Sequence, residues 1–121
     1  MAEKILIVDD DEMVRMALVE LLKPEGYDVF AVSSGSLALE KLEEETFDLM
    51  LLDIIMPEMD GIDLCKRIRQ LERHKETPIA FLTAKSQEAD KAEGLEAGAK
   101  LFLSKPISPE KLLELITKAI G

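Results

Sequence analysis

Five short runs of apolar residues constrain the fold of this chain more than any other feature of its sequence. They are residues 5–8, 29–32, 49–52, 79–82 and 101–103, and each contains only three or four residues. Each run is nearly continuous rather than alternating, a pattern typical of strands buried on both faces of a parallel sheet. The runs therefore predict five buried strands.

Segments with helical spacing separate these runs. The apolar face of the first comprises Val14, Ala17, Leu18, Leu21 and Leu22, and that of the last comprises Leu112, Leu113, Ile116 and Ile120. Pro24 and Gly26 are expected to end the first helix, because proline and glycine stop helices. Asp11 is expected to cap the first helix and Ser108 the last, with Pro109 at the first position of the last helix.

Three further helices are predicted between the inner runs. Ser34 or Ser36 can cap the first of them, which continues through Leu37, Ala38 and Leu42. Ile62, Leu64, Cys65, Ile68 and Leu71 share the apolar face of the second. The third runs from about Gln87 to Ala97, with Gly98 as its C-terminal cap. Strands that alternate with helices predict a single α/β domain over residues 1–121, with helices on both faces of a five-stranded parallel sheet.

Charge and cysteine content narrow the class of protein. The chain has 25 acidic and 15 basic residues, a formal net charge of −10, which disfavours direct binding to nucleic-acid phosphates. Its only cysteine, Cys65, excludes a disulfide within the chain and fits a reducing cytoplasm. The first apolar run is too short for a signal segment or a membrane span, which predicts a soluble, cytoplasmic protein.

Polar residues follow four of the five runs directly. Asp9 and Asp10 follow the first, Asp53 the third, Thr83 the fourth, and Lys105 comes shortly after the fifth. The carboxyl ends of parallel strands share one edge of the sheet, where open α/β sheets bind ligands. We therefore expect residues that are far apart in the sequence to meet in one crevice.

Three carboxylates in one crevice repel one another unless a cation joins them. Mg²⁺ suits such a site, with Mn²⁺ as an alternative, because hard cations prefer oxygen ligands. Lys105 adds a second positive charge and Thr83 a hydroxyl group. Together these groups can surround a phosphoryl group while a carboxylate attacks it, which predicts phosphorylation of an aspartate.

These residues belong to motifs that resemble one known family. The motifs are Ile5–Asp10, Leu52–Gly61, Phe81–Ala84, Gly94–Ala99 and Lys105–Pro106. In this order and spacing, from about Lys4 to Ile120, they resemble the receiver domain of two-component response regulators. The resemblance implies the flavodoxin-like, CheY-like fold, with strand order 2-1-3-4-5, and a Lys105–Pro106 peptide that is often cis.

The resemblance also assigns roles to residues. It implies that Asp53 is the phosphoacceptor and that Asp9, Asp10, Asp53 and the backbone carbonyl of Ile55 bind Mg²⁺. Thr83 would bond the phosphoryl oxygen, and Lys105 would bridge it to the acidic site. Phe102 stands where the family has an aromatic residue that changes rotamer on activation, although packing in the last strand explains it equally well.

The partners are likewise implied by the resemblance. They are a sensor histidine kinase or a histidine phosphotransfer protein as phosphodonor, and a downstream protein that binds the face formed by the fourth helix, last strand and last helix. Dimerisation through that face is an open alternative. Either the chain is a single-domain regulator, which we favour, or it is the receiver part of a longer one.

Other classes of protein fit the sequence less well. Aspartyl-phosphate phosphatases of the haloacid dehalogenase type have an acid two residues after the nucleophile, where this chain has Ile55. We therefore expect a phosphorylated switch that catalyses only its own phosphorylation and dephosphorylation, not a turnover enzyme. No glycine-rich nucleotide-binding motif occurs in the sequence. A docking-only receiver would have lost the acceptor, an acidic ligand or the lysine.

Three other residues are expected to have structural roles. Gly61 follows Asp60 in what resembles a turn, where glycine permits a positive φ. His74 lies in the polar run Glu72–Glu76, which predicts a solvated loop residue. Cys65 has helical spacing with Ile62 and Ile68, which predicts a buried structural thiol.

Overall fold

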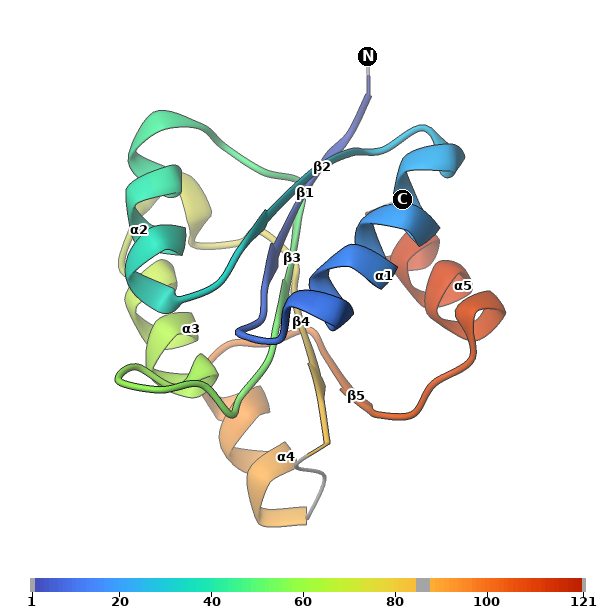
Figure 1. Ribbon diagram of the computed structural model, residues 1–121. Helices are drawn as coiled ribbons and strands as arrows, with labels where there is room; N and C mark the ends of the chain where they lie inside the picture. The colour runs from blue at the N-terminus through green and yellow to red at the C-terminus, as the bar shows by residue number, and fades with distance from the viewer. Residues whose placement is uncertain (1, 85–87, 121) are drawn as a thin grey trace.

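Five parallel strands form one sheet in the order β2-β1-β3-β4-β5, which confirms the predicted topology (Figure 1). The computed structural model describes residues 2–84 and 88–120. The strands are β1 (Lys4–Val8), β2 (Asp28–Val32), β3 (Leu49–Leu52), β4 (Ile79–Thr83) and β5 (Leu101–Ser104). The helices are α1 (Glu12–Leu22), α2 (Gly35–Glu44), α3 (Gly61–Arg69), α4 (Glu88–Glu96) and α5 (Pro109–Ile120). Two short 3₁₀ helices, η1 (Lys23–Glu25) and η2 (Glu72–His74), complete the elements.

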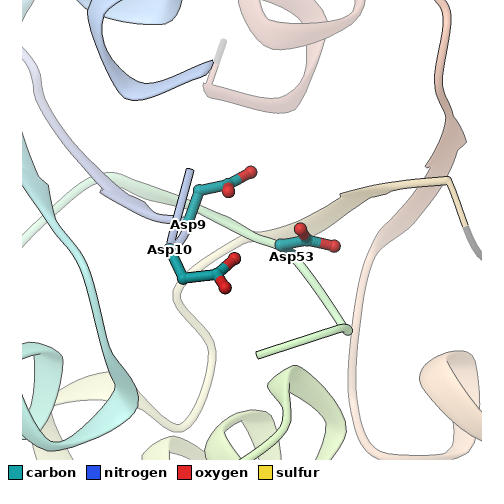
Figure 2. Close-up of side chains that lie close together, drawn as sticks. All are labelled: Asp9, Asp10 and Asp53. Atoms are coloured by element: carbon teal, nitrogen blue, oxygen red, sulfur yellow. The ribbon is translucent and has the colours of Figure 1, made fainter. Parts of the chain in front are cut away.

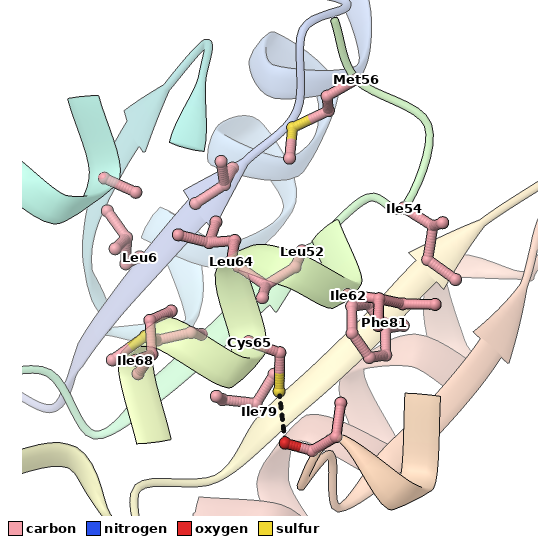
Figure 3. Close-up of a cluster of buried hydrophobic side chains, with 14 of the residues drawn as sticks. Leu6, Leu52, Ile54, Met56, Ile62, Leu64, Cys65, Ile68, Ile79 and Phe81 are labelled. Atoms are coloured by element: carbon pink, nitrogen blue, oxygen red, sulfur yellow. Dashed lines mark hydrogen bonds between the residues drawn. The ribbon is translucent and has the colours of Figure 1, made fainter. Parts of the chain in front are cut away.

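The helices cover both faces of the sheet, as the alternation of strands and helices predicted. Figure 1 shows α1 and α5 on one face and α2 and α3 on the other. Each layer encloses its own core. The core beneath α3 includes Leu6, Leu52, Leu64, Cys65 and Phe81 (Figure 3), and that beneath α1 and α5 includes Ile7, Leu22, Leu51 and Ile116. Alternate residues of each central strand supply the two cores, because successive side chains point to opposite faces.

The prediction of burial on both faces holds for the central strands and is wrong for the edges. All residues of β3 and β4 are buried, as are all but the first of β1. In β2 only Val29 is buried, and in β5 only Leu103. A strand at the edge of a sheet has one neighbour instead of two, so its side chains remain partly in contact with water.

Side-chain caps begin the helices close to where the sequence placed them. The carboxylate of Asp11 accepts a hydrogen bond from the N–H of Met13 at 2.9 Å, and the hydroxyl of Ser108 accepts one from the N–H of Lys111 at 3.2 Å. Of the two serines considered for α2, Ser34 is the cap. These side-chain oxygens satisfy N–H groups that have no partner within the helix.

The ends of the helices were predicted less accurately. Gly26, with a φ of 94°, ends α1 and its 3₁₀ extension η1, and Gly98, with a φ of 113°, ends α4. Both glycines were expected to end these helices. However, α3 ends at Arg69, and Leu71 lies beyond it with an exposed side chain. Gln87, at which the fourth helix was expected to begin, lies outside the described residues.

Cys65 confirms the prediction of a buried structural thiol. Its side chain is fully buried, and its Sγ donates a hydrogen bond to the carbonyl of Ala97 at 3.5 Å (Figure 3). Burial raises the pKa of the thiol, which keeps it in the unreactive, protonated form.

The prediction for His74 was wrong, because its side chain is fully buried in η2. Its Nδ1 lies 3.0 Å from the hydroxyl oxygen of Thr77, and its Nε2 has no hydrogen-bond partner among the described residues. The turn that joins α3 to β4 folds this side chain inward, although its sequence neighbours are charged. Burial, and to a smaller extent the positive charges of Arg73 and Arg69, lower the pKa of His74 below 6.5.

This lowered pKa predicts that the protein loses stability in mildly acidic solution. As the pH falls below about 6.5, the unfolded chain binds a proton that folded His74 resists. The free energy of unfolding should then fall by up to about 1.4 kcal/mol per pH unit. Urea unfolding between pH 7.5 and 5.5 measures this slope, and His74→Gln, which removes the only histidine, should flatten it. An equal slope in both proteins would contradict the assignment.

None of the helices formed by residues 2–84 and 88–120 is long and apolar enough to cross a membrane.

Candidate active site

The carboxyl ends of the central strands bring the predicted site residues to one edge of the sheet. Val8 pairs in register with Leu52, and Thr83 pairs with Ser104. The residues that follow β1 and β3, Asp9 and Asp53, therefore lie at the same level of the sheet. The N–H of Lys105 donates to the carbonyl of Thr83 at 2.8 Å, which aligns the end of β5 with that of β4.

Three carboxylates meet at this edge. Figure 2 shows Asp9 and Asp10 following β1, with Asp53 beside them at the end of β3. One oxygen from each lies within 4.8 Å of one oxygen from each of the others. Asp9 and Asp53 are only 3% and 8% exposed, whereas Asp10 is exposed. Carboxylates this close repel one another, and burial weakens the screening of that repulsion by water.

Lys105 compensates part of this negative charge. Its Nζ lies 3.0 Å from Oδ2 of Asp9 and 3.7 Å from Oδ2 of Asp53, and the side chain is half-buried. The Lys105–Pro106 peptide is cis, as expected. One ammonium group among three carboxylates leaves two negative charges, which matches one divalent cation. Three carboxylate oxygens are also the hard ligands that Mg²⁺ prefers, so the residues present fit this ion.

Hydrogen bonds hold Asp9 from several directions. Its N–H donates to the carbonyl of Val32 in β2 at 3.2 Å, and its Oδ1 accepts from the N–H of Asp11 at 2.9 Å. Its own carbonyl accepts from a guanidinium nitrogen of Arg15 at 2.8 Å. The protein's own hydrogen bonds thus fix the position of this buried carboxylate.

Asp53 is held by the neighbouring strand and by the loop that follows it. Its N–H donates to the carbonyl of Val8 at 3.0 Å, and its Oδ1 accepts from the N–H of Ile55 at 3.3 Å. Ile55 itself is 56% exposed. That the carbonyl of Ile55 binds the cation stays a prediction.

Gly61 allows the loop after Asp53 to fold back against the strand end. Its N–H donates to the carbonyl of Ile54 at 2.9 Å, and a Cβ at this position would lie 2.0 Å from the carbonyl oxygen of Asp53. The expected turn with a positive φ was wrong, because Asp60 caps α3 and Gly61 is its first residue. Close approach of two backbone segments, not backbone conformation, requires glycine here.

The two candidate switch residues lie at different depths. Thr83 is fully buried at the end of β4. It lies beside the edge of the sheet that carries Asp9, Asp10 and Asp53, which we call the acidic edge. Phe102 is half-buried in β5, with its ring centre 5.9 Å from that of Phe81. A Cβ on Gly94 would lie about 3.0 Å from the Phe102 ring, so α4 packs closely on this aromatic pair. Phe102 is not one of the residues that meet at the acidic cluster.

The roles of two residues that bear on the site, Arg15 and Gly61, were not predicted from the sequence. An arginine on a helix is by default a solvated residue, and no local pattern indicated that Arg15 folds back onto Asp9. Gly61 was noticed but was assigned the wrong reason for being glycine. Both depend on contacts that exist only after the chain has folded.

Comparison with known proteins agrees with this geometry. The family model of the response regulator receiver domain matches residues 5–117. The alkaline phosphatase synthesis transcriptional regulatory protein PhoP of Bacillus subtilis is 46% identical over 112 residues, which cover 93% of this chain and 46% of PhoP. The transcriptional regulatory protein SrrA of Staphylococcus aureus is 40% identical over 113 residues, again 93% of this chain and 46% of the relative. The chain thus spans about half the length of these relatives.

Solved structures resemble the chain over nearly its full length. The chemotaxis protein CheY4 of Vibrio cholerae has a TM-score of 0.94 at 34% identity, with 98% of this chain and 99% of that chain covered. The receiver domain of a sensor histidine kinase from Pseudomonas aeruginosa has a TM-score of 0.91 at 30% identity, covering 100% and 99% of the two chains. That structure has a magnesium ion coordinated in its active-site cleft.

Proposed function

The chain belongs to the response regulator receiver domain family of two-component signalling, and from this premise we propose that Asp53 is its phosphoacceptor. The observation that carries the proposal is the placement of Asp53. Its carboxylate lies within 4.8 Å of two further carboxylates and 3.7 Å from the ammonium group of Lys105. Among the described residues, no other group of three metal-binding side chains lies this close together.

The proposed reaction transfers a phosphoryl group between two side chains. A carboxylate oxygen of Asp53 attacks the phosphorus atom of a phosphohistidine on a sensor kinase or phosphotransfer protein. The new O–P bond forms as the P–N bond breaks, and the electron pair of that bond stays on the imidazole nitrogen. The other ring nitrogen of the phosphohistidine carries a proton, so the products are an aspartyl phosphate on this chain and a neutral histidine on the donor.

The surrounding residues stabilise the transferred group. Asp9, Asp10, Asp53 and the carbonyl of Ile55 would hold Mg²⁺ or Mn²⁺, which supplies positive charge next to the phosphoryl oxygens. The ammonium group of Lys105 neutralises a second oxygen, and the Thr83 hydroxyl donates a hydrogen bond to a third. The magnesium ion in the similar receiver domain from Pseudomonas aeruginosa supports this choice of cation.

We further propose that the chain carries one phosphoryl group at a time and is not a turnover enzyme. Ile55 stands two residues after Asp53 and cannot transfer a proton to or from water. Its N–H donates to the carboxylate of the acceptor, and Ile55 itself is apolar and exposed. The chain then catalyses only its own phosphorylation and dephosphorylation.

The signal is proposed to leave through the face formed by α4, β5 and α5. Thr83 and Phe102 link the acidic edge to this face, since they lie on the adjacent strands β4 and β5. A downstream protein, or a second copy of the chain, would bind there when Asp53 is phosphorylated.

Residues 1–121 would form one receiver domain that acts in the cytoplasm. Its net charge of −10 argues against direct contact of this domain with nucleic acid.

Intact mass after incubation with Mg²⁺ and a small acylphosphate such as acetyl phosphate tests the proposed acceptor chemistry. We expect one added phosphoryl group per chain, which maps to the peptide containing Asp53 and is lost when a chelator is present. A phosphoryl group on another residue would contradict the assignment. If no group is added, Mg²⁺ and a beryllium fluoride mimic of the phosphoryl group should still bind at Asp53, and failure of both would favour a docking-only receiver.

Replacing Lys105 by alanine should separate cation binding from signalling. Asp9, Asp10 and Asp53 remain, so the variant should still bind Mg²⁺. Loss of one nearby positive charge should change the Mg²⁺ affinity by no more than about threefold. Without the ammonium group, the phosphorylated variant should lose the amide chemical-shift changes in α5 that the wild-type protein shows. Full changes in α5 of the phosphorylated variant would contradict this role.

A further inference from the structure

We infer that Arg15 is a positioning residue for the cation site and acts through the Asp9–Asp10 peptide. The inference rests on the proposed function, because it assigns to Asp10 the role of a cation ligand. The carboxylates of Asp9 and Asp53 are buried and bonded, but that of Asp10 is exposed. Something other than packing must therefore direct it toward the other two.

The contact that carries the inference joins the side chain of Arg15 to the backbone that precedes α1. Arg15 lies in the second turn of α1, where its N–H donates to the carbonyl of Asp11 at 3.0 Å. Its side chain turns back past the start of the helix, and Nη1 reaches the carbonyl oxygen of Asp9 at 2.8 Å. The side chain is half-buried, so this hydrogen bond is partly shielded from water.

The bonded carbonyl belongs to the peptide unit that leads into Asp10. A peptide unit is planar, so fixing the carbonyl oxygen of Asp9 also fixes the N–H and Cα of Asp10. The other end of Asp9 is already fixed, because its N–H is bonded to Val32. These two hydrogen bonds lie on the peptide units before and after the Asp9 Cα, and the one from Arg15 orients the peptide whose N–Cα bond carries the Asp10 side chain.

Arg15 also brings a positive charge close to the site, and this has the opposite effect on a cation. A guanidinium group repels Mg²⁺, whereas a correctly directed carboxylate attracts it. Removing Arg15 should therefore raise the affinity for Mg²⁺ through the lost repulsion, or lower it through the lost orientation of Asp10. Partners of this kind, which orient a ligand without touching the metal, typically contribute a factor of about 10 or more to affinity.

Titration with Mg²⁺, followed by the amide chemical shifts of the acidic edge, separates these effects. We expect Arg15→Ala to bind Mg²⁺ about 10-fold more weakly than the wild-type protein. Arg15→Lys can still donate to the carbonyl and should recover at least half of the lost binding free energy. In the metal-free proteins, Arg15→Ala should shift the Asp10 amide signal, while the signals of Ile5 to Val8 change little.

Arg73→Ala is the matched control. The guanidinium of Arg73 also donates to a backbone carbonyl, that of Leu42, at 2.7 Å. Arg73 lies in η2, which precedes the amino-terminal end of β4, whereas the acidic site lies at the carboxyl ends of the strands. This variant should lose stability and keep the wild-type affinity for Mg²⁺. A similar loss of affinity in both arginine variants would overturn the inference, because general loosening would then explain it.

Two other results would also overturn it: unchanged or tighter Mg²⁺ binding by Arg15→Ala, and no recovery by Arg15→Lys. Failure of the proposed function gives a different pattern. In that case the wild-type protein itself would not bind Mg²⁺ at the acidic edge, and its spectrum would not respond to the ion at all.

Discussion

Asp53→Ala should take up no phosphoryl group and, without divalent cations, should be more stable than the wild-type protein. The first effect follows from loss of the proposed nucleophile. The second follows from the crowding of three carboxylates within 4.8 Å, two of them buried. Removing one relieves repulsion, and the closer ion pair of Lys105, with Asp9 at 3.0 Å, remains. We expect a gain of about 1 kcal/mol in the free energy of unfolding.

Intact mass and urea unfolding in a chelator measure these two effects. Asp60→Ala provides the matched control, since it removes a carboxylate from the same loop. The Asp60 side chain caps α3, accepting from the N–H of Asp63 at 2.8 Å. Its loss should cost about 1 kcal/mol of stability while leaving phosphorylation intact. The two variants should therefore change stability in opposite directions. If Asp53→Ala were instead less stable than the wild-type protein, the contacts that the Asp53 carboxylate makes would outweigh the repulsion at the acidic edge.

Gly61→Ala adds one methyl group, and we expect it to lower stability and slow phosphorylation more than any other added methyl group near the site. Its Cβ would lie 2.0 Å from the carbonyl oxygen of Asp53, and backbone atoms cannot rotate away as a flexible side chain can. Either α3 moves outward or the strand end that carries Asp53 shifts. We expect a loss of about 3 kcal/mol in the free energy of unfolding, with phosphorylation slowed at least 10-fold, because the acceptor is displaced.

Gly26→Ala is the control for this prediction. Gly26 has a φ of 94°, which strains any other residue, but a Cβ added there would have no neighbour within 4 Å. Its substitution should cost about 1 kcal/mol and leave phosphorylation unchanged. Unfolding by urea and the rate of phosphoryl uptake distinguish the two variants. Equal effects would indicate that general strain, not contact with Asp53, determines the outcome at Gly61.

The sheet and the position of the site could be predicted from sequence because they depend on local patterns. Continuous apolar runs identified the strands, and the rule that parallel strands share their carboxyl ends brought Asp9, Asp53 and Lys105 together. The resemblance to receiver domains supplied the strand order, which the structure confirms. Asp11 and Ser108 were identified as caps for the same reason, since capping depends on residues only two or three positions apart.

The features that sequence reasoning missed depend on contacts between distant segments or on how a loop folds. His74 was expected to be solvated because its neighbours are charged, yet the turn between α3 and β4 buries its ring. Gly61 is required by the backbone of Asp53, eight positions earlier, and no local pattern reports such an approach. Edge strands resemble central ones in sequence, so only the strand order, which the resemblance supplied, could have indicated the exposure of β2 and β5.

The acidic site is assembled from residues that belong to separate strands, and this ties cation binding to the folding equilibrium. Lys105 and Asp9 are 96 positions apart, and Asp53 follows a third strand. An unfolded chain cannot hold these groups together, so a divalent cation binds essentially the native state alone. By mass action, a free concentration 100 times the dissociation constant would raise the free energy of unfolding by about 2.7 kcal/mol. The ion that serves phosphoryl transfer would thereby also protect the chain from unfolding between signals.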